Sequence, residues 1–114
     1  MDEDVQAAAA RLVRRLKEGG HTITVAESCT GGLLASAFTD IAGASHWFNQ
    51  SWVTYSNQAK TTELGVSPEL LEKEGAVSAY VAIEMAKGAL ERANASIAIS
   101  ITGIAGPSND GSSK

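Results

Sequence analysis

The sequence Ala-Glu-Ser-Cys-Thr-Gly-Gly, residues 26–32, joins a predicted strand to a predicted helix, and the rest of the chain is organised around it. Before it, residues 21–26 alternate apolar and polar side chains with the period of two that is typical of a β-strand. After it, apolar residues recur at helical spacing from Leu33 to Ile41. The pattern predicts a strand that ends, and a helix that begins, within a few residues of Ser28.

A turn of this kind can build a nucleophile and an anion-binding site together. It presents a side chain at the carboxyl end of a strand, while the first free amides of the following helix point the same way. The geometry is that of a nucleophile elbow, although the G-x-S-x-G pattern is absent. Ser28 is the candidate nucleophile. The candidate donors to the oxyanion of an acyl intermediate are the amides of Thr30, Gly31 and Gly32. The alternatives are a tight strand-to-helix connection and a phosphate cradle.

The composition sets the class of protein. A chain of 114 residues, of which 44% are hydrophobic and 19% are charged, predicts one small domain over residues 1–114. The net charge of -4 gives no electrostatic reason to bind nucleic acid or an anionic membrane, and we expect neither partner. An acidic start and the lack of a long apolar run favour a cytoplasmic location.

The inventory of ligating and nucleophilic side chains is small. Cys29 is the only cysteine and is accompanied by two histidines, so we expect no internal disulfide and no spaced cluster of zinc ligands. We expect no metal and no cofactor; the alternative is a metal site made from scattered carboxylates, which nothing in the spacing requires. Cys29 is interpreted as a buried, inert side chain rather than a redox thiol. His21 opens the first predicted strand at the end opposite Ser28, and His46 lies in an aromatic loop. A Ser-His-Asp triad is therefore disfavoured, and lysine is the other base that serine enzymes use.

Helix caps and β-propensity divide the remaining chain into alternating elements. A first amphipathic helix ends at Gly19. Serine caps predict three helices in the second half of the chain, within residues 56–65, 67–75 and 78–94. Strand-forming sequences lie at residues 51–56 and 96–101. This order predicts an α/β fold, a layered sheet of mainly parallel strands flanked by helices.

The loops that carry chemistry gather at the carboxyl ends of the strands in such a sheet. Three loops qualify, at residues 28–32, 55–60 and 102–106. Lysine works as a base near neutral pH only if its pKa falls by roughly three units from about 10.4, at a cost of about 4 kcal/mol. Burial and the amino-terminal end of a helix both act in that direction. Lys60 is therefore the candidate base for Ser28, with Tyr55 as a hydrogen-bonding support, which predicts a hydrolase of an amide or ester.

Each of these features also has an interpretation without catalysis. Lys60 can be an exposed side chain that follows a tyrosine, and residues 102–107 can form a glycine turn or a cradle for a ligand phosphate. Glu27 opposes the scheme if its carboxylate holds Lys60 in the charged form. Because Glu27 alternates with Ser28 along the turn, we expect its side chain to point elsewhere.

Four segments taken in order are far more specific than any one of them. They read Ala-Glu-Ser-Cys-Thr-Gly-Gly at 26–32, Val-Thr-Tyr-Ser-Asn-Gln-Ala-Lys at 53–60, Gly-Ala-Val-Ser at 75–78 and Ser-Ile-Thr-Gly-Ile-Ala-Gly-Pro at 100–107. This set resembles the CinA C-terminal domain family, the nicotinamide-nucleotide amidases also called PncC. The resemblance implies metal-free hydrolysis of the carboxamide of nicotinamide mononucleotide to nicotinic acid mononucleotide and ammonia, a step in pyridine nucleotide recycling.

The resemblance also implies roles for single residues, with a pyridine nucleotide as the small-molecule partner. On the family pattern Ser28 is the nucleophile, Lys60 is the base that later protonates the departing ammonia, and Tyr55 supports them. The residues implied to bind the substrate are Thr30, Gly31, Gly32, Asn57, Thr102, Gly103 and Gly106.

Family members continue past a segment like residues 111–114 into further strands and a closing helix, and this chain stops there. We therefore expect a fold that is incomplete at its C-terminus, with a mobile polar tail at residues 108–114. An open apolar sheet edge favours a homo-oligomer or association with a separate C-terminal fragment. The alternative function is a non-catalytic nucleotide-binding or regulatory module that uses the same pocket. Nucleic-acid binding, which the historical family name suggests, is disfavoured by the acidic balance.

Overall fold

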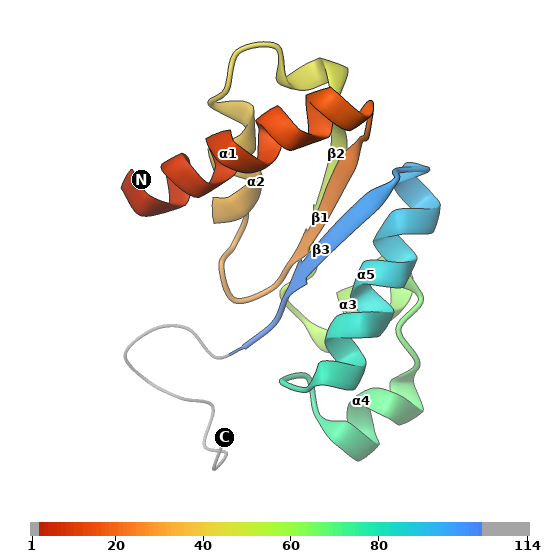
Figure 1. Ribbon diagram of the computed structural model, residues 1–114. Helices are drawn as coiled ribbons and strands as arrows, with labels where there is room; N and C mark the ends of the chain where they lie inside the picture. The colour runs from red at the N-terminus through yellow and green to blue at the C-terminus, as the bar shows by residue number, and fades with distance from the viewer. Residues whose placement is uncertain (1–2, 104–114) are drawn as a thin grey trace.

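The computed structural model of the chain describes residues 3–103. Within this range three strands alternate with five α-helices and one short 3-10 helix, η1 (Figure 1). In chain order the elements are α1 (Glu3–Gly19), β1 (Ile23–Glu27), α2 (Leu33–Thr39), η1 (Ala44–His46), β2 (Phe48–Val53), α3 (Asn57–Leu64), α4 (Pro68–Glu74), α5 (Ala79–Ala93) and β3 (Ile97–Ile101). The predicted tail at residues 108–114 lies outside the described residues.

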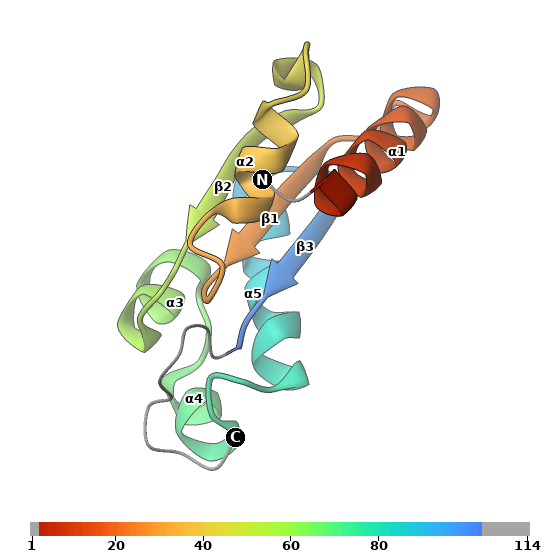
Figure 2. The same ribbon diagram turned by 90° about the vertical axis from the view of Figure 1, so that its left-hand side faces the viewer.

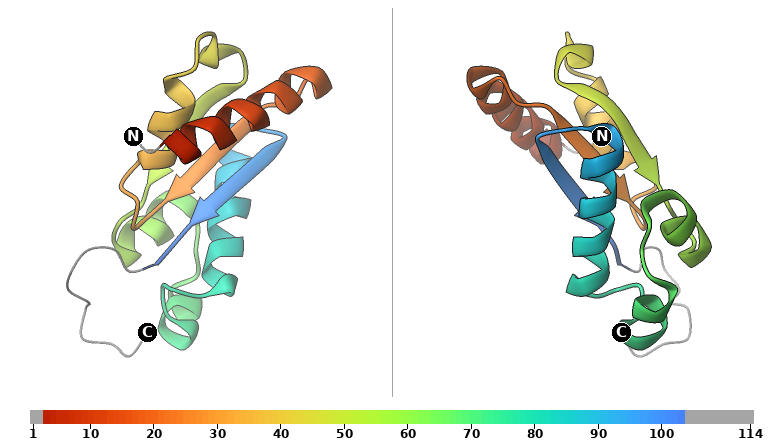
Figure 3. Two further views of the ribbon diagram at one scale, coloured as in Figure 1. Left: turned by 60° about the vertical axis from the view of Figure 1, so that its left-hand side comes forward. Right: turned by 90° about the vertical axis from the view of Figure 1, so that its right-hand side faces the viewer.

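The three strands form one parallel sheet in the order β2-β1-β3. β1 is the central strand, with Ala26 beside Trp52 of β2 and Ser100 of β3. All three strands run in the same direction and end at the same edge of the sheet (Figure 3). The predicted α/β fold, a sheet of parallel strands flanked by helices, is confirmed.

The second predicted strand lies earlier in the chain than the sequence analysis placed it. The structure has β2 at Phe48–Val53, whereas the propensities favoured residues 51–56. Pairing with Ile23 at the start of β1 extends the strand back to Phe48. At its other end the chain turns out of the sheet after β2, because Ser56 is used as the N-cap of α3.

Helices cover both faces of the sheet, with α1 and α2 on one face and α3 and α5 on the other (Figure 2). Helix α4 packs against α3 and α5 beyond the carboxyl ends of the strands (Figure 2). The core on the first face consists of Ala9, Val13, Leu16, Ile23, Val25, Ala37, Phe38 and Trp47. The core on the second face consists of Ala26, Leu64, Val66, Leu71, Val81, Met85 and Ala89. Since side chains alternate along a strand, Val25 joins the first core and Ala26 the second. The same alternation directs Glu27 toward α2 and Ser28 toward α3.

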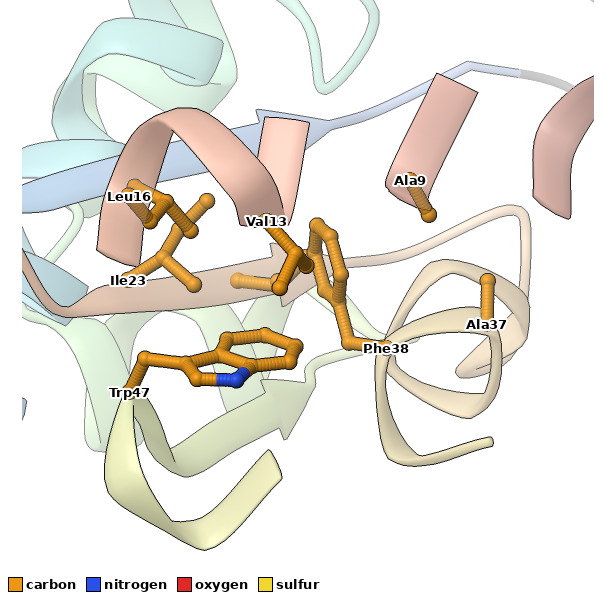
Figure 4. Packing of buried hydrophobic residues seen from close by; sticks show 8 residues of the cluster. Ala9, Val13, Leu16, Ile23, Ala37, Phe38 and Trp47 are labelled. Atoms are coloured by element: carbon orange, nitrogen blue, oxygen red, sulfur yellow. The ribbon is translucent and has the colours of Figure 1, made fainter. Parts of the chain in front are cut away.

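Aromatic packing closes the first core between α1, α2 and η1. The rings of Phe38 and Trp47 meet edge to face, with centroids 5.6 Å apart and an interplanar angle of 84° (Figure 4). Val13 of α1 lies beside the Phe38 ring, and Leu16 of the same helix lies against Ile23 of β1 (Figure 4). This apolar layer holds the segment that leads into β2 against the first core.

Serine caps begin the three helices of the second face, as predicted. The side chains of Ser56, Ser67 and Ser78 accept hydrogen bonds from main-chain amides in the first turns of α3, α4 and α5. Such caps satisfy amides that otherwise have no partner in the helix. The Ser56 cap matters most for the site, because it sets the starting point of the helix that carries Lys60.

Gly88 on α5 marks the closest approach of two helices. A Cβ at this position would meet the main-chain oxygen of Leu64 on α3. Gly88→Ala should therefore lower the free energy of unfolding by about 1–3 kcal/mol, although alanine normally favours a helix. Urea denaturation measures the effect. Lys87→Ala, at the exposed neighbouring position, should change stability by less than about 0.5 kcal/mol. Equal stability of Gly88→Ala and the unsubstituted chain would contradict this contact.

The outer strands β2 and β3 each pair with β1 alone within residues 3–103. The expected association with another chain or fragment along such an edge stays a prediction. None of the helices in the described part of the chain is long and apolar enough to cross a membrane.

Candidate active site

The carboxyl ends of the three strands place three hydroxyl-bearing residues side by side. Ser28 follows β1, and its main-chain amide donates to the oxygen of Ile101 at the end of β3, at 3.0 Å. Thr54 follows β2, and its amide donates to the oxygen of Glu27 at 2.9 Å. The main-chain hydrogen bonding of the sheet thus continues one residue past the ends of β1 and β2. Thr54, Ser28 and Thr102 therefore line one edge of the sheet, where the reactive loops were predicted.

Lys60 and Ser28 are in direct contact although 32 positions separate them. Lys60 Nζ lies 3.0 Å from Ser28 Oγ and donates to the main-chain oxygen of Thr54 at 3.0 Å. A third, longer contact joins Nζ to the main-chain oxygen of Tyr55 at 3.4 Å. Lys60 is 1% exposed and Ser28 is 5% exposed, so water has little access to the pair. The predicted approach of these two side chains is present in the structure.

Burial lowers the pKa of Lys60 below its ordinary value of 10.5, while the neighbouring Cys29 opposes this shift. The acceptors around Nζ are a hydroxyl and two carbonyl oxygens, all of them neutral. A neutral amine suits this arrangement, since its two N–H groups can donate to the carbonyls of Thr54 and Tyr55. Its lone pair then faces Ser28 Oγ and can accept the hydroxyl proton.

The lowered pKa of Lys60 should make the free energy of unfolding rise with pH in the alkaline range. The unfolded chain keeps the ordinary pKa of 10.5. Between the lowered pKa and 10.5 the unfolded state binds more protons than the folded state, so stability increases with pH across that window. Urea unfolding from about pH 7 to about pH 10.5 measures the slope. Lys60→Met should have a smaller slope, and an identical slope in both proteins would contradict the shift.

Glu27 points away from Lys60, as its alternation with Ser28 predicted. Its carboxylate is fully buried and accepts hydrogen bonds from Thr30 Oγ1 at 2.6 Å and from the amides of Leu34 and Ala35, both at 2.9 Å. All three donors lie in the turn or in the first turn of α2. The carboxylate therefore does not hold Lys60 in the charged form.

Several amides around the start of α2 are already engaged, including one of the three predicted oxyanion donors, Gly31. Glu27 already occupies the amides of Leu34 and Ala35, so they are not free for a substrate. The amide of Gly31 donates to the main-chain oxygen of Ser28 at 3.1 Å. Among the predicted donors, only the amides of Thr30 and Gly32 have no hydrogen bond of this kind within residues 3–103.

The family model of the CinA C-terminal domain matches residues 5–114. The chain belongs to this family. The nicotinamide-nucleotide amidohydrolase PncC of Escherichia coli (strain K12) is 50% identical over 113 residues, which make up 99% of this chain and 67% of that protein. The PncC of Enterobacter agglomerans is 56% identical over 99 residues, or 87% of this chain and 60% of that protein.

A solved structure of the same superfamily has the same fold. The competence/damage inducible protein CihA from Agrobacterium tumefaciens matches with a TM-score of 0.93 and 45% sequence identity, over 99% of this chain and 68% of that chain. The protein ECK1530/EC0983 from Escherichia coli matches with a TM-score of 0.90 and 40% identity, over 97% of this chain and 66% of that chain. This CinA domain thus spans about two thirds of the length of these relatives.

Other predicted site residues of this CinA domain lie at the rim rather than beside the pair. The Tyr55 side chain is 68% exposed, and its contact with Lys60 is made by the main-chain carbonyl, not by the phenol. Asn57 is exposed as the first residue of α3, and it lines a surface hollow with Pro68 and Leu71. The Thr30 hydroxyl is turned toward Glu27. The supporting role assigned to Tyr55 and the substrate-binding roles assigned to Asn57 and Thr30 stay predictions.

The glycines of the site serve two different purposes. Gly31 and Gly32 adopt φ values of 64° and 104°, which side chains rarely tolerate, so they allow the sharp turn after Ser28. Gly103 lies next to Cys29, since a Cβ at this position would be 3.4 Å from its Sγ. Cys29 is half-buried rather than fully buried as expected. Gly106 lies outside the described residues.

The roles of two residues in this CinA domain's site were not predicted from the sequence. Thr54 holds Lys60 through its carbonyl, and its own hydroxyl is buried without a partner in the described part of the chain. Glu27 holds the turn, as described above. Their positions in the sequence could have identified both residues, because both stand at the carboxyl end of a strand.

His21 and His46 line a hollow beside Trp47 at the other end of the sheet. Residues 3–103 contain no group of three His, Cys, Asp or Glu side chains placed to hold a metal ion.

Proposed function

We propose that this CinA domain hydrolyses the carboxamide of nicotinamide mononucleotide, giving nicotinic acid mononucleotide and ammonia, with Ser28 as nucleophile and Lys60 as base. The single observation that carries the mechanism is the buried contact of 3.0 Å between Lys60 Nζ and Ser28 Oγ. The names of the PncC relatives support the substrate, since they are nicotinamide-nucleotide amidohydrolases.

The reaction requires one proton carrier that works in both directions. Ser28 Oγ attacks the carboxamide carbon while its proton passes to the neutral amine of Lys60. The tetrahedral intermediate collapses when the Lys60 ammonium gives this proton to the amide nitrogen, which leaves as ammonia. Water then attacks the acyl ester, Lys60 accepts a proton from it, and the proton returns to Ser28 Oγ as the carboxylic acid product departs. One water is consumed and one ammonia is released in each cycle.

The oxyanion of the intermediate needs donors that are not already engaged. The amides of Thr30 and Gly32 fit this role, because the Gly31 amide bonds to the oxygen of Ser28. Tyr55 at the rim and Asn57, Thr102, Gly103 and Gly106 complete the proposed set of substrate contacts.

The test is release of ammonia from nicotinamide mononucleotide, with formation of nicotinic acid mononucleotide followed by mass spectrometry. Turnover at a rate proportional to protein concentration is the expected result. Saturable binding of the mononucleotide without ammonia release would contradict the amidase and would favour a nucleotide-binding or regulatory module. Absence of both binding and turnover would contradict the pyridine nucleotide as the partner.

A further inference from the structure

Glu27 carries a carboxylate that is fully buried next to the nucleophile turn and that the proposed reaction does not use. A buried carboxylate is costly unless hydrogen bonds compensate it. Here Oε1 accepts from Thr30 Oγ1 and from the amide of Leu34, and Oε2 accepts from the amide of Ala35. Every donor belongs to the segment that follows Ser28. The carboxylate therefore ties the end of β1 to the first turn of α2, across the nucleophile turn.

The turn itself has little internal restraint. Gly31 and Gly32 are adjacent, and glycine has the largest range of backbone conformations. Two main-chain hydrogen bonds lie within the turn, from the Gly31 amide to the oxygen of Ser28 at 3.1 Å and from the Leu33 amide to the oxygen of Thr30 at 3.3 Å. The sheet holds the near side, where the Ser28 amide donates to the oxygen of Ile101. The side of the turn that leads into α2 is held by the hydrogen bonds to Glu27.

The direction of the carboxylate also suits the charge of the site. A carboxylate at the start of a helix is favoured by the positive end of the helix dipole. This placement turns the negative charge of Glu27 toward α2, on the face of the sheet opposite α3 and Lys60. A carboxylate directed at Lys60 would raise the pKa of its amine and remove the base.

We infer that Glu27 is the positioning residue for the nucleophile: its buried carboxylate fixes the turn so that Ser28 Oγ stays within reach of Lys60 Nζ. The inference rests on the proposed role of Ser28 as nucleophile, but not on the identity of the amide substrate. Glu27 acts through the turn and touches neither the substrate nor the reacting atoms.

The decisive variant is Glu27→Gln, which keeps the size of the side chain. In glutamine an NH2 group, which only donates, replaces one of the two carboxylate oxygens. Because Leu34 donates to Oε1 and Ala35 to Oε2, one of these two amides then faces a donor and loses its partner. Thr30→Val removes only the third hydrogen bond and should have a weaker effect in the same direction. Glu63→Gln makes the same charge change at an exposed position on α3 and serves as the matched control.

The reactivity of Ser28 can be measured without any nucleotide. A fluorophosphonate reagent phosphonylates an activated serine with loss of fluoride, and intact-mass spectrometry gives the rate and the site after digestion. Glu27→Gln should slow this labelling by about tenfold to a hundredfold, the effect expected of a misplaced reacting group. With nicotinamide mononucleotide, kcat should fall by a similar factor while KM changes little. Glu63→Gln should stay within about twofold of the unsubstituted chain. Circular dichroism at the assay temperature verifies that each variant is folded.

The outcomes separate this inference from the proposed function. Labelling of Glu27→Gln at the rate of the unsubstituted chain overturns the positioning role. If Glu27→Gln does not fold, the labelling rate of Thr30→Val is measured instead. A rate equal to that of the unsubstituted chain then overturns the positioning role of Glu27. An unsubstituted chain that is labelled at Ser28 but releases no ammonia overturns the proposed substrate alone, and the labelling ratio still decides on Glu27. No labelling of Ser28 in the unsubstituted chain overturns both.

Discussion

Replacing Lys60 by methionine should abolish ammonia release and leave a folded protein. Methionine has a similar length, so it can fill the space of a side chain that is 1% exposed. It cannot accept a proton from Ser28 Oγ, which lies 3.0 Å from Nζ in the structure. Loss of a positioned general base should lower kcat by about 10²–10⁴-fold. The measurement is the initial rate of ammonia release, with circular dichroism to verify the fold.

Lys73→Met provides the matched control for this prediction. Lys73 is exposed on α4, and the substitution makes the same exchange of lysine for methionine away from Ser28. Its rate should stay within about twofold of the unsubstituted chain. Full activity of Lys60→Met would refute the Ser/Lys mechanism, because no other amine is among the contacts of Ser28 in the described part of the chain.

Removal of the Ser28 hydroxyl should have an effect at least as large. Ser28→Ala deletes the oxygen that forms the acyl ester, and loss of a catalytic nucleophile lowers kcat by roughly 10³-fold or more. Only one hydrogen bond to Lys60 is lost from the fold, which costs about 1 kcal/mol. The variant should therefore unfold in a single transition close to that of the unsubstituted chain, and it should still bind the mononucleotide.

Ser96→Ala is the control for the loss of a serine hydroxyl. Ser96 is exposed just before β3, at the other end of the sheet from Ser28, and its hydroxyl contacts only Thr22 within the described residues. This variant should keep the full rate. An active Ser28→Ala protein would show that water attacks the carboxamide directly, without an acyl ester on the serine.

Much of the fold and the central pair of the site could be predicted from local patterns. Serine caps mark helix starts because a hydroxyl satisfies a free amide, and Ser56 placed Lys60 near the beginning of α3. Alternating strands and helices imply a parallel sheet, whose carboxyl ends collect the functional loops. These two rules together brought Lys60 to the end of the strand that precedes Ser28.

What could not be predicted depends on contacts between distant segments. The start of β2 is set by pairing with Ile23, a contact between distant residues that β-propensity does not predict. The free amides at the start of α2 were inferred from a rule about isolated helices, whereas a buried Glu27 already satisfies two of them. The exposure of Tyr55 depends on the path of the chain after β2, and strand propensity gives no information on it.

The burial of Lys60 also limits which substitutions position 60 can accept as the sequence diverges. α3 fully buries only two of its side chains, Lys60 and Leu64, so the residue that carries the reactive amine also helps to attach the helix to the domain. A descendant that abandoned the chemistry would still need a long aliphatic stem at position 60 to keep α3 in place. Methionine or leucine there, rather than alanine or serine, is the substitution by which inactive descendants should be recognised.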